Sequence, residues 1–577
     1  MSNKQNKAPL EAVEHIKTDS NYLRGTIAEG LKNAVTGALQ DSDTQLTKFH
    51  GIYQQDDRDI RVERRRQKLE PLYSFMIRAR VPAGISTPQQ WLAMDDLAER
   101  YGGGSIRLTT RQAFQLHGIL KRNLKTTIAG INQSLLDTIA ACGDVNRNVM
   151  CTPNPENSSI HAAVAKAAAS VSAHLTPATT AYHEIWLEGE KVVDTQKQSS
   201  DHEPIYGKTY LPRKFKTVFA IPPHNDVDIY AHDLGYIAIV EDGQLIGFNI
   251  TVGGGMGATH GDSATFPLLA QVIGFCGVEQ VCEVAEAVVT IQRDFGERTN
   301  RKHARFKYTI DDRGIDWFKQ ELNQRLGWDL ELEKSFEFTS TGDRYGWSEN
   351  DDGSFNVTVF IENGRIKDQP GFMLRTALRK VAEIHTGDFR LTANQNVIVS
   401  GISPQQKSRI EKILDEYGLF DQNKRSLLRI NSMACVAFPT CTLAMAEAER
   451  YLPSLLDKIE VLQHHYQISD RAIVTRMTGC PNGCARPYMA ELGFVGKGPG
   501  KYNMYLGGDF SGKRLNKMYR ENIDEATILQ ELDVIFSDYA QHADEQEQFG
   551  SFVIRAGYVQ AVTHGSQVHL MTGENHA

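Results

Sequence analysis

The stretch that decides the fold is SIRLTTRQAFQLHGI at residues 105–119, because a second copy, DFRLTANQNVIVSGI, stands at 388–402. The two copies share Arg, Leu, Thr, Gln, Gly and Ile at matching positions, 283 residues apart. The same spacing relates two later pairs, Asn148 with Asn431 and Met150 with Met433. A common strand-and-turn composition could produce the first match, but the second makes coincidence a poor explanation. The chain is therefore predicted to contain two related halves.

Outward from these copies, each half is predicted to be an α/β unit followed by a longer α/β domain. Alternating apolar runs such as SFMIRARV indicate strands, while QQWLAMDDLAERY and VCEVAEAVVTIQRDF have helical spacing. A ligand is expected where the halves meet, since clefts between domains are common binding sites. The predicted units are an extended or partly helical arm at 1–70, a first repeat at 71–145, a central domain at 146–345, a second repeat at 346–425 and a last domain at 426–577.

Composition narrows the class of protein. The chain has 577 residues, of which 41% are hydrophobic and 23% charged, which is typical of a soluble enzyme with several domains. A formal charge of −8 argues against nucleic-acid binding. We expect a cytoplasmic protein without membrane contact, because there is neither a long apolar run nor the apolar segment of a signal peptide.

Four of the eight cysteines are clustered, in NSMACVAFPTC and TGCPNGC. Cys435 and Cys441 form C-x5-C, and Cys480 and Cys484 form C-x3-C. Four thiolates suit an iron–sulfur cubane, and Pro-Asn-Gly between the last two favours a turn that brings both sulfurs to one centre. Structural zinc is the alternative, although its sites favour shorter knuckles. The remaining cysteines are expected to be packing residues: Cys142, Cys151, Cys276 and Cys282.

Cations recur in pairs at alternate positions. Arg78 and Arg80, Arg107 and Arg111, and Lys214 and Lys216 would each share a strand face. Such pairs commonly face solvent, but their repetition in apolar segments favours a cavity that binds an anion. The glycine-rich TVGGGMG at 251–257 lacks the spacing of a phosphate loop, and we expect its backbone to approach a large flat ligand.

The cysteine motifs resemble those of the nitrite and sulfite reductase family, which joins a 4Fe-4S cluster to a sirohaem. Further segments, including YLRGTIAEGL, FHGIYQQDDRDIR and YLPRKFKT, extend the resemblance over almost the whole chain, and they favour the assimilatory NADPH-dependent branch. The implied fold is α/β of the α+β kind, with pseudo-two-fold duplication: two ferredoxin-like repeats and two mixed α/β domains that hold the sirohaem and the cluster.

The resemblance also implies roles for particular residues. Cys484 would link the cluster to the haem iron, completing the ligand set Cys435, Cys441, Cys480 and Cys484. Sirohaem contacts would be Arg107, Arg111 and His117, and sulfite would be bound by Arg80, Arg147, Lys214 and Lys216. Because sulfite sheds its oxygens as water, the last two are expected to donate protons.

The implied activity is six-electron reduction of sulfite to sulfide for cysteine biosynthesis. No flavin or nicotinamide fingerprint is present in the sequence, so NADPH, FAD and FMN would act only through a partner, the flavoprotein (alpha) subunit of a hetero-oligomer. The N-terminal arm is a candidate docking segment. The alternatives are a ferredoxin-dependent nitrite or sulfite reductase, which differs in donor and preferred anion, and a non-catalytic iron–sulfur carrier, in which the cations would have no purpose.

Overall fold

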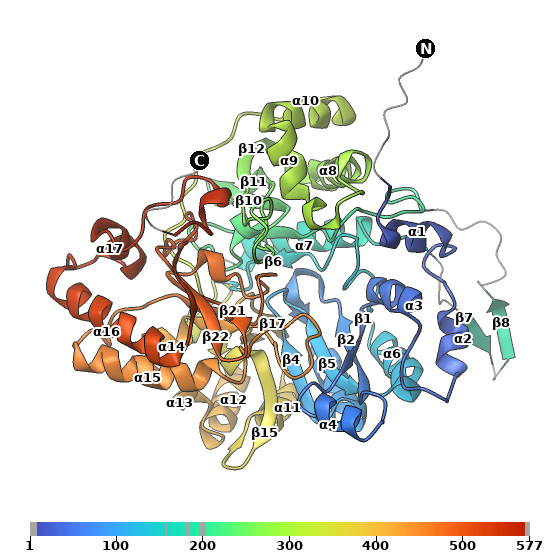
Figure 1. The fold of residues 1–577 in the computed structure, drawn as a ribbon, viewed down its shortest axis with the longest axis horizontal. Helices are drawn as coiled ribbons and strands as arrows, with labels where there is room; N and C mark the ends of the chain where they lie inside the picture. Colours follow the sequence, from blue (N-terminus) through green and yellow to red (C-terminus); the bar gives the residue numbers. More distant parts are fainter. Residues whose placement is uncertain (1–8, 157, 180–183, 188–189, 195–202, 572–577) are drawn as a thin grey trace.

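The computed structural model describes residues 9–156, 158–179, 184–187, 190–194 and 203–571 (Figure 1). Four sheets and one hairpin, β7 (Glu184–Leu187) with β8 (Glu190–Asp194), form its strands. Two of the sheets belong to the repeats and two to the longer domains. The duplication predicted from the two sequence copies, and the α+β fold implied by the family resemblance, are confirmed.

The repeats exchange strands. The first sheet has the order β1 (Ile52–Asp56), β2 (Tyr73–Ala79), β5 (Phe114–Ile119), β4 (Ser105–Leu108), β15 (Arg365–Gln369) and β16 (Phe372–Met373). The second has the order β13 (Gly346–Glu349), β14 (Phe355–Val359), β18 (Val397–Ile402), β17 (Asp388–Leu391) and β3 (Ile85–Ser86). In the first, β15 lies beside β4 (Figure 1). Arg365 of β15 stands opposite Arg107 of β4. In the second, β3 lies beside β17, with Ile85 opposite Arg390. Each repeat therefore completes the sheet of the other.

One hydrophobic core serves both repeats. Trp91, on α5 (Pro88–Tyr101), stacks on Phe389 of β17 at 4.5 Å and meets Phe114 of β5 edge-on at 5.7 Å. The matching helix of the second repeat is α11 (Leu374–Ile384), whose Arg379 pairs with Asp95 of α5 at 2.6 Å. Burial of these large rings favours association of the two repeats by several kcal/mol, at about 25 cal/mol per Å² of apolar surface.

The two longer domains have sheets of the same topology. The central sheet has the order β6 (Met150–Cys151), β9 (Thr217–Ala220), β10 (Leu234–Glu241), β11 (Gln244–Val252) and β12 (Gln271–Gly277). The last sheet has the order β19 (Ser432–Ala434), β20 (Thr475–Thr478), β21 (Leu492–Gly498), β22 (Lys501–Leu506) and β23 (Lys517–Ile523). In both, the first two pairings are parallel and the last two antiparallel.

Helices follow corresponding strands in the two domains. A helix joins the first two strands of each sheet, and another follows the last strand: α7 (Ser158–His174) and α8 (Val281–Phe295) in the central domain, α15 (Leu452–His465) and α16 (Glu525–His542) in the last domain. Others are α6 (Leu124–Gln133), α9 (Phe306–Arg313), α10 (Ile315–Leu326), α12 (Pro404–Glu416), α13 (Leu419–Asn423), α14 (Leu427–Ile430) and α17 (Phe549–Arg555). None of the helices in the described ranges has both the length and the apolar character needed to cross a bilayer.

The segment predicted as an arm is packed into the body from residue 9 onward. It carries α1 (Ala12–Asp19), α2 (Ile27–Lys32), α3 (Asp41–Leu46), α4 (Arg61–Arg66) and the sheet strand β1. Leu23, Ile27, Leu46 and Phe49 are buried in the core of the central domain. The segment is thus partly helical over 9–70, and residues 1–8 lie outside the described part. The remaining predicted domain boundaries stay predictions.

Candidate active site

The site begins where the turn after β4 meets the cysteine-bearing turn of the last domain. Thr110 donates its hydroxyl to the carbonyl of Cys484 at 2.9 Å, and Arg486 donates to the carbonyl of Thr110 at 3.2 Å. Arg486 also pairs with Asp228, the residue at the corresponding turn of the central domain. The first repeat, the central domain and the last domain therefore meet beside Cys484, where a ligand was expected.

The four clustered cysteines are brought together by two loops. Gly479 donates its N–H to the Sγ of Cys435 at 3.3 Å, and the side chain of Asn482 donates to the Sγ of Cys480 at 3.6 Å. Burial and then the neighbouring thiolates of Cys484, Cys480 and Cys441 raise the pKa of Cys435 well above its ordinary value. Burial, Cys480 and Cys484 raise the pKa of Cys441 to about 11.

These thiols fit the implied cluster. Gathering four mutually repelling sulfurs in a half-buried site is unfavourable unless positive metal ions neutralise them. In a cubane each of the four thiolates binds a different iron, whereas zinc draws its ligands to one point. The other four cysteines form no disulfide and are buried or half-buried.

Lys214 and Lys216 face the cysteine turn. They flank Phe215, which is fully buried, whereas both lysines are half-buried on the opposite side of the chain, so the predicted alternation is present. Burial, Arg305 and Lys216 lower the pKa of Lys214 well below its ordinary value, and the thiolate of Cys484 opposes them. Burial and Arg111 lower the pKa of Lys216 to about 7, while Asp233 opposes them.

Arg111 and Arg147 complete this cationic group. Arg111 donates to the carbonyls of Asn148 at 2.6 Å and Thr217 at 2.9 Å, and burial lowers its pKa to about 9. Arg147 donates to the carbonyls of Gly143 at 2.8 Å and Ala141 at 3.3 Å. Arg147 and Arg78 both contribute to lowering the pKa of Arg111, so the three guanidinium groups lie near one another.

Two buried nitrogen atoms indicate that an anionic cofactor fits here. Neither Nδ1 of His117 nor Nε of Arg111 has a hydrogen-bond partner within the described part of the chain. Burial and the cations Arg365, Arg107 and Arg78 lower the pKa of His117 well below its ordinary value. A ligand with carboxylates, such as sirohaem, would supply the missing acceptors and offset the repulsion among the cations.

Two of the predicted site residues, Arg80 and Arg107, are bound by other protein groups. Arg80 follows the last residue of β2, so strand alternation no longer applies, and its guanidinium binds Asp137 at 2.7 Å and Thr176 at 2.5 Å. The assignment of Arg80 to the anion stays a prediction, and Arg78, inside β2, also lies with the cationic group. Arg107 is a β4 residue bound to Glu449 at 2.9 Å and to the carbonyl of Ala434 at 3.0 Å, next to Cys435, and its contact with a sirohaem stays a prediction.

The glycine-rich turn after β11 packs closely against other parts of the protein, and its approach to a flat ligand stays a prediction. A Cβ on Gly254 would lie 2.3 Å from the carbonyl of Tyr230, and one on Gly257 would meet the guanidinium of Arg305. Next to it, Ala258 donates its N–H to the carbonyl of Pro481 at 2.8 Å. These glycines therefore allow the central domain to reach the Cys480–Cys484 turn.

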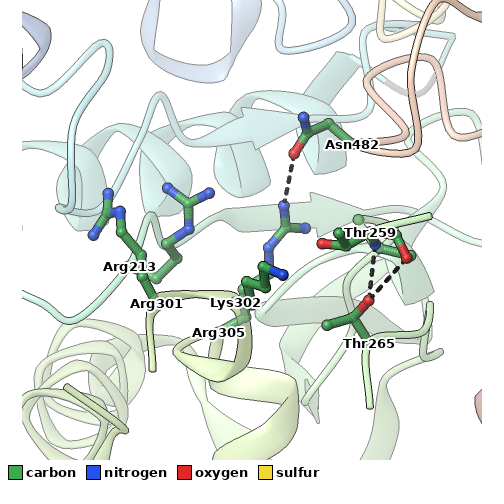
Figure 2. Close-up of a pocket in the computed structure, with 9 residues that line it drawn as sticks. Arg213, Thr259, Thr265, Arg301, Lys302, Arg305 and Asn482 are labelled. Atoms are coloured by element: carbon green, nitrogen blue, oxygen red, sulfur yellow. Dashed lines mark hydrogen bonds between the residues drawn. The ribbon is translucent and has the colours of Figure 1, made fainter. Parts of the chain in front are cut away.

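Beside that turn lies a cationic pocket of about 230 Å³ (Figure 2). Arg213, Arg301, Lys302 and Arg305 line one side, and Asn482 accepts from Arg305 at 3.5 Å. Its charge and size suit a small oxyanion or the carboxylate arms of a larger ligand. Arg305 and Arg213 were not among the predicted site residues, although the basic runs RKHARFK and LPRKFK contain them. The buried Asp233 was not predicted either, because no pattern of charges in the sequence distinguishes it.

Family comparisons agree with this architecture. The model described as "Nitrite/Sulfite reductase ferredoxin-like half domain" matches residues 67–134 and 348–417. The model described as "Nitrite and sulphite reductase 4Fe-4S domain" matches residues 167–330, in the central domain. The chain therefore belongs to the nitrite and sulfite reductase family.

Similar curated proteins share nearly the full length. A protein from Oceanobacillus iheyensis, named sulfite reductase (NADPH) hemoprotein beta-component, is 61% identical over 98% of this chain and 97% of its own length. A protein of the same name from Staphylococcus haemolyticus is 59% identical over 97% of each chain. In fold, the structure resembles Mycobacterium tuberculosis NirA protein, with a TM-score of 0.77, 24% identity, and coverage of 95% of this chain and 97% of that one.

Proposed function

We propose that this protein is the haem-bearing subunit of an assimilatory NADPH-dependent sulfite reductase, which reduces sulfite to sulfide by six electrons for cysteine biosynthesis. The observation that carries the proposal is the position of Lys214, Lys216 and Arg111 beside a four-cysteine site. A cluster alone would need the thiols but not the half-buried cations that face Cys484. The names of the similar proteins support the choice of sulfite and of NADPH.

In this proposal Cys435, Cys441, Cys480 and Cys484 hold a 4Fe-4S cluster, and Cys484 also binds the iron of a sirohaem. The bound cofactors supply electrons to the sulfur atom. The protein contributes the rest: Arg111 and His117 orient the acidic cofactor, while Arg78 and Arg147 hold the oxyanion. Lys214 and Lys216 stabilise its negative charge and donate protons to the departing oxygens.

The lowered pKa of Lys216 suits its proposed role as a proton donor. An amine that titrates at about 7 is protonated in a useful fraction of molecules near neutral pH, and it releases its proton more readily than an ordinary lysine. Asp233, whose pKa burial raises to about 6, interacts electrostatically with Lys216 and favours its charged form.

We further propose that electrons arrive from a flavoprotein subunit carrying FAD and FMN, in a cytoplasmic hetero-oligomer. The hemoprotein "beta-component" in the names of the relatives supports such a partner. The N-terminal segment remains a candidate contact for it.

The test is an absorption spectrum of the purified protein, followed by turnover of sulfite and nitrite with a chemical reductant and with the co-expressed flavoprotein. Sirohaem bands with sulfide production are expected. An iron–sulfur shoulder without haem bands would contradict the proposal and favour an electron carrier. Preference for nitrite, or electron transfer only from ferredoxin, would favour the other branch of the family.

A further inference from the structure

A loop from the N-terminal segment is attached to the loop that carries Cys441. One guanidinium nitrogen of Arg58 donates hydrogen bonds to the carbonyl of Cys441 at 3.0 Å and to that of Ala444 at 2.7 Å. Its guanidinium carbon lies 4.4 Å from the centre of the Phe438 ring, and its backbone N–H donates to the carbonyl of Pro439 at 3.2 Å. One residue therefore contacts the cysteine loop at four points.

The loop around Arg58 is itself held in place. Arg61 binds Asp56 through two contacts of 2.6 Å, and the side chain of Asp57 accepts from the backbone of Asp59 at 3.0 Å. Asp59 then pairs with Arg450, beyond the cysteine loop, at 2.7 Å. That last pair is half-exposed and contributes little alone, but it fixes the second side of the same junction.

This attachment is not needed to fold the segment. The apolar residues Leu23, Ile27, Leu46 and Phe49 already anchor the segment in the central domain. By contrast, the cysteine loop is poorly covered: Leu443 is 63% exposed and Met445 39% exposed. A loop with little apolar burial of its own needs polar contacts to keep one conformation.

Arg58 also places a permanent positive charge beside one cysteine. A cation near a cluster stabilises its reduced, more negative state, and hydrogen bonding and charge around the sulfurs are among the factors that set its potential. We propose that Arg58 is a positioning residue that locks the Cys441 loop onto the cluster and raises the reduction potential of the cluster. This inference rests on the proposed 4Fe-4S site.

The test compares the holoenzyme with Arg58→Gln, Arg58→Lys and the control Arg65→Gln. Arg65 is an exposed residue of α4, and its side chain has no hydrogen bond or ion pair within the described ranges, so its substitution removes the same charge without the contacts. Two properties are measured: hydrogen exchange of peptides spanning 438–446, and the cluster potential in a redox titration followed by electron paramagnetic resonance.

For Arg58→Gln we expect exchange at least tenfold faster and an equilibrium constant for cluster reduction about tenfold lower, which is about 59 mV for one electron. Arg58→Lys should retain most of the potential but still exchange faster, because an ammonium group does not stack on Phe438 as the guanidinium plane does. Arg65→Gln should match the wild type in both.

Equal behaviour of Arg58→Gln and Arg65→Gln in both measurements would overturn the inference. If Arg58→Gln does not fold, the exchange of Arg58→Lys decides, and a wild-type rate there would overturn it as well. A wild-type protein without iron–sulfur absorption would instead contradict the proposed function, so the two failures are distinguishable.

Discussion

Substituting Arg80 and Arg78 separately tests whether the structure assigns their roles correctly. Arg80→Gln should destabilise the protein without weakening sulfite binding, because its guanidinium binds Asp137 through contacts of 2.7 and 3.1 Å and donates to Ser172 and Thr176. Arg78→Gln should instead weaken sulfite binding, because that side chain lies with Arg111 and Arg147.

The size of the first effect follows from the surroundings of the pair. Hydrogen bonds to charged groups contribute about 1.5–3 kcal/mol when buried. The side chain of Arg80 is 10% exposed but that of Asp137 is 40% exposed, so solvent screens the pair. We expect a loss of about 2 kcal/mol in the free energy of unfolding, with KM for sulfite within about twofold of the wild type.

For Arg78→Gln we expect KM for sulfite to rise about tenfold, which is about 1.4 kcal/mol of lost binding. The measurements are denaturant unfolding and steady-state sulfite reduction with a chemical reductant, with the exposed Arg100→Gln as a charge-matched control. If Arg80→Gln raised KM tenfold at unchanged stability, the placement of Arg80 outside the anion site would be refuted.

Three further predictions have separate outcomes. Sulfite turnover should fall as pH rises through about 7, where Lys216 loses its charge, and Lys216→Arg should extend binding to higher pH in a KM profile. Burial raises the pKa of Asp226 to about 8, so the native state holds a proton that the unfolded chain releases above about 4. The buried carboxyl of Asp226 therefore lowers the free energy of unfolding increasingly from pH 4 to pH 8. In melting experiments, Asp226→Asn should stabilise the protein by about 3 kcal/mol at pH 8 and by little at pH 4. Cys484→Ser should lose haem or its coupling to the cluster, whereas Cys276→Ser should retain both by iron content and absorption; equal losses would contradict the division between ligand and packing cysteines.

The duplicated fold could be predicted because the same short sequence motif occurs in both halves. RLT-x-x-Q recurs at 107–112 and 390–395, and both copies place their Gln in the left-handed region, with φ of 49° and 73°. The exchange of β3 and β15 could not be predicted, since nothing in a repeat spacing says which copy a strand will pair with. Burial of Leu23 and Phe49 was also missed, because isolated apolar residues in a charged segment have no periodicity.

The site was predictable where spacing determines geometry. The cysteines and the Lys214–Phe215–Lys216 alternation lie as their patterns indicate. The contacts of Arg80 with Asp137 and Thr176 could not be predicted, because β2 ends one residue before it and strand ends are hard to locate from sequence. Asp233 and Arg305 reach the site through the folding of the central domain, which no local pattern encodes.

The strand exchange between the repeats has a consequence for any attempt to divide this chain. A fragment containing only the first repeat would lose β15 from its sheet and leave the edge of β4 open, while β3 would have no partner. In two copies of such a fragment, β3 of each copy could pair with the open edge of β4 in the other, and the copies would associate as a swapped dimer. The junction between the halves is thus an interface of the kind that joins separate subunits, built into a single polypeptide.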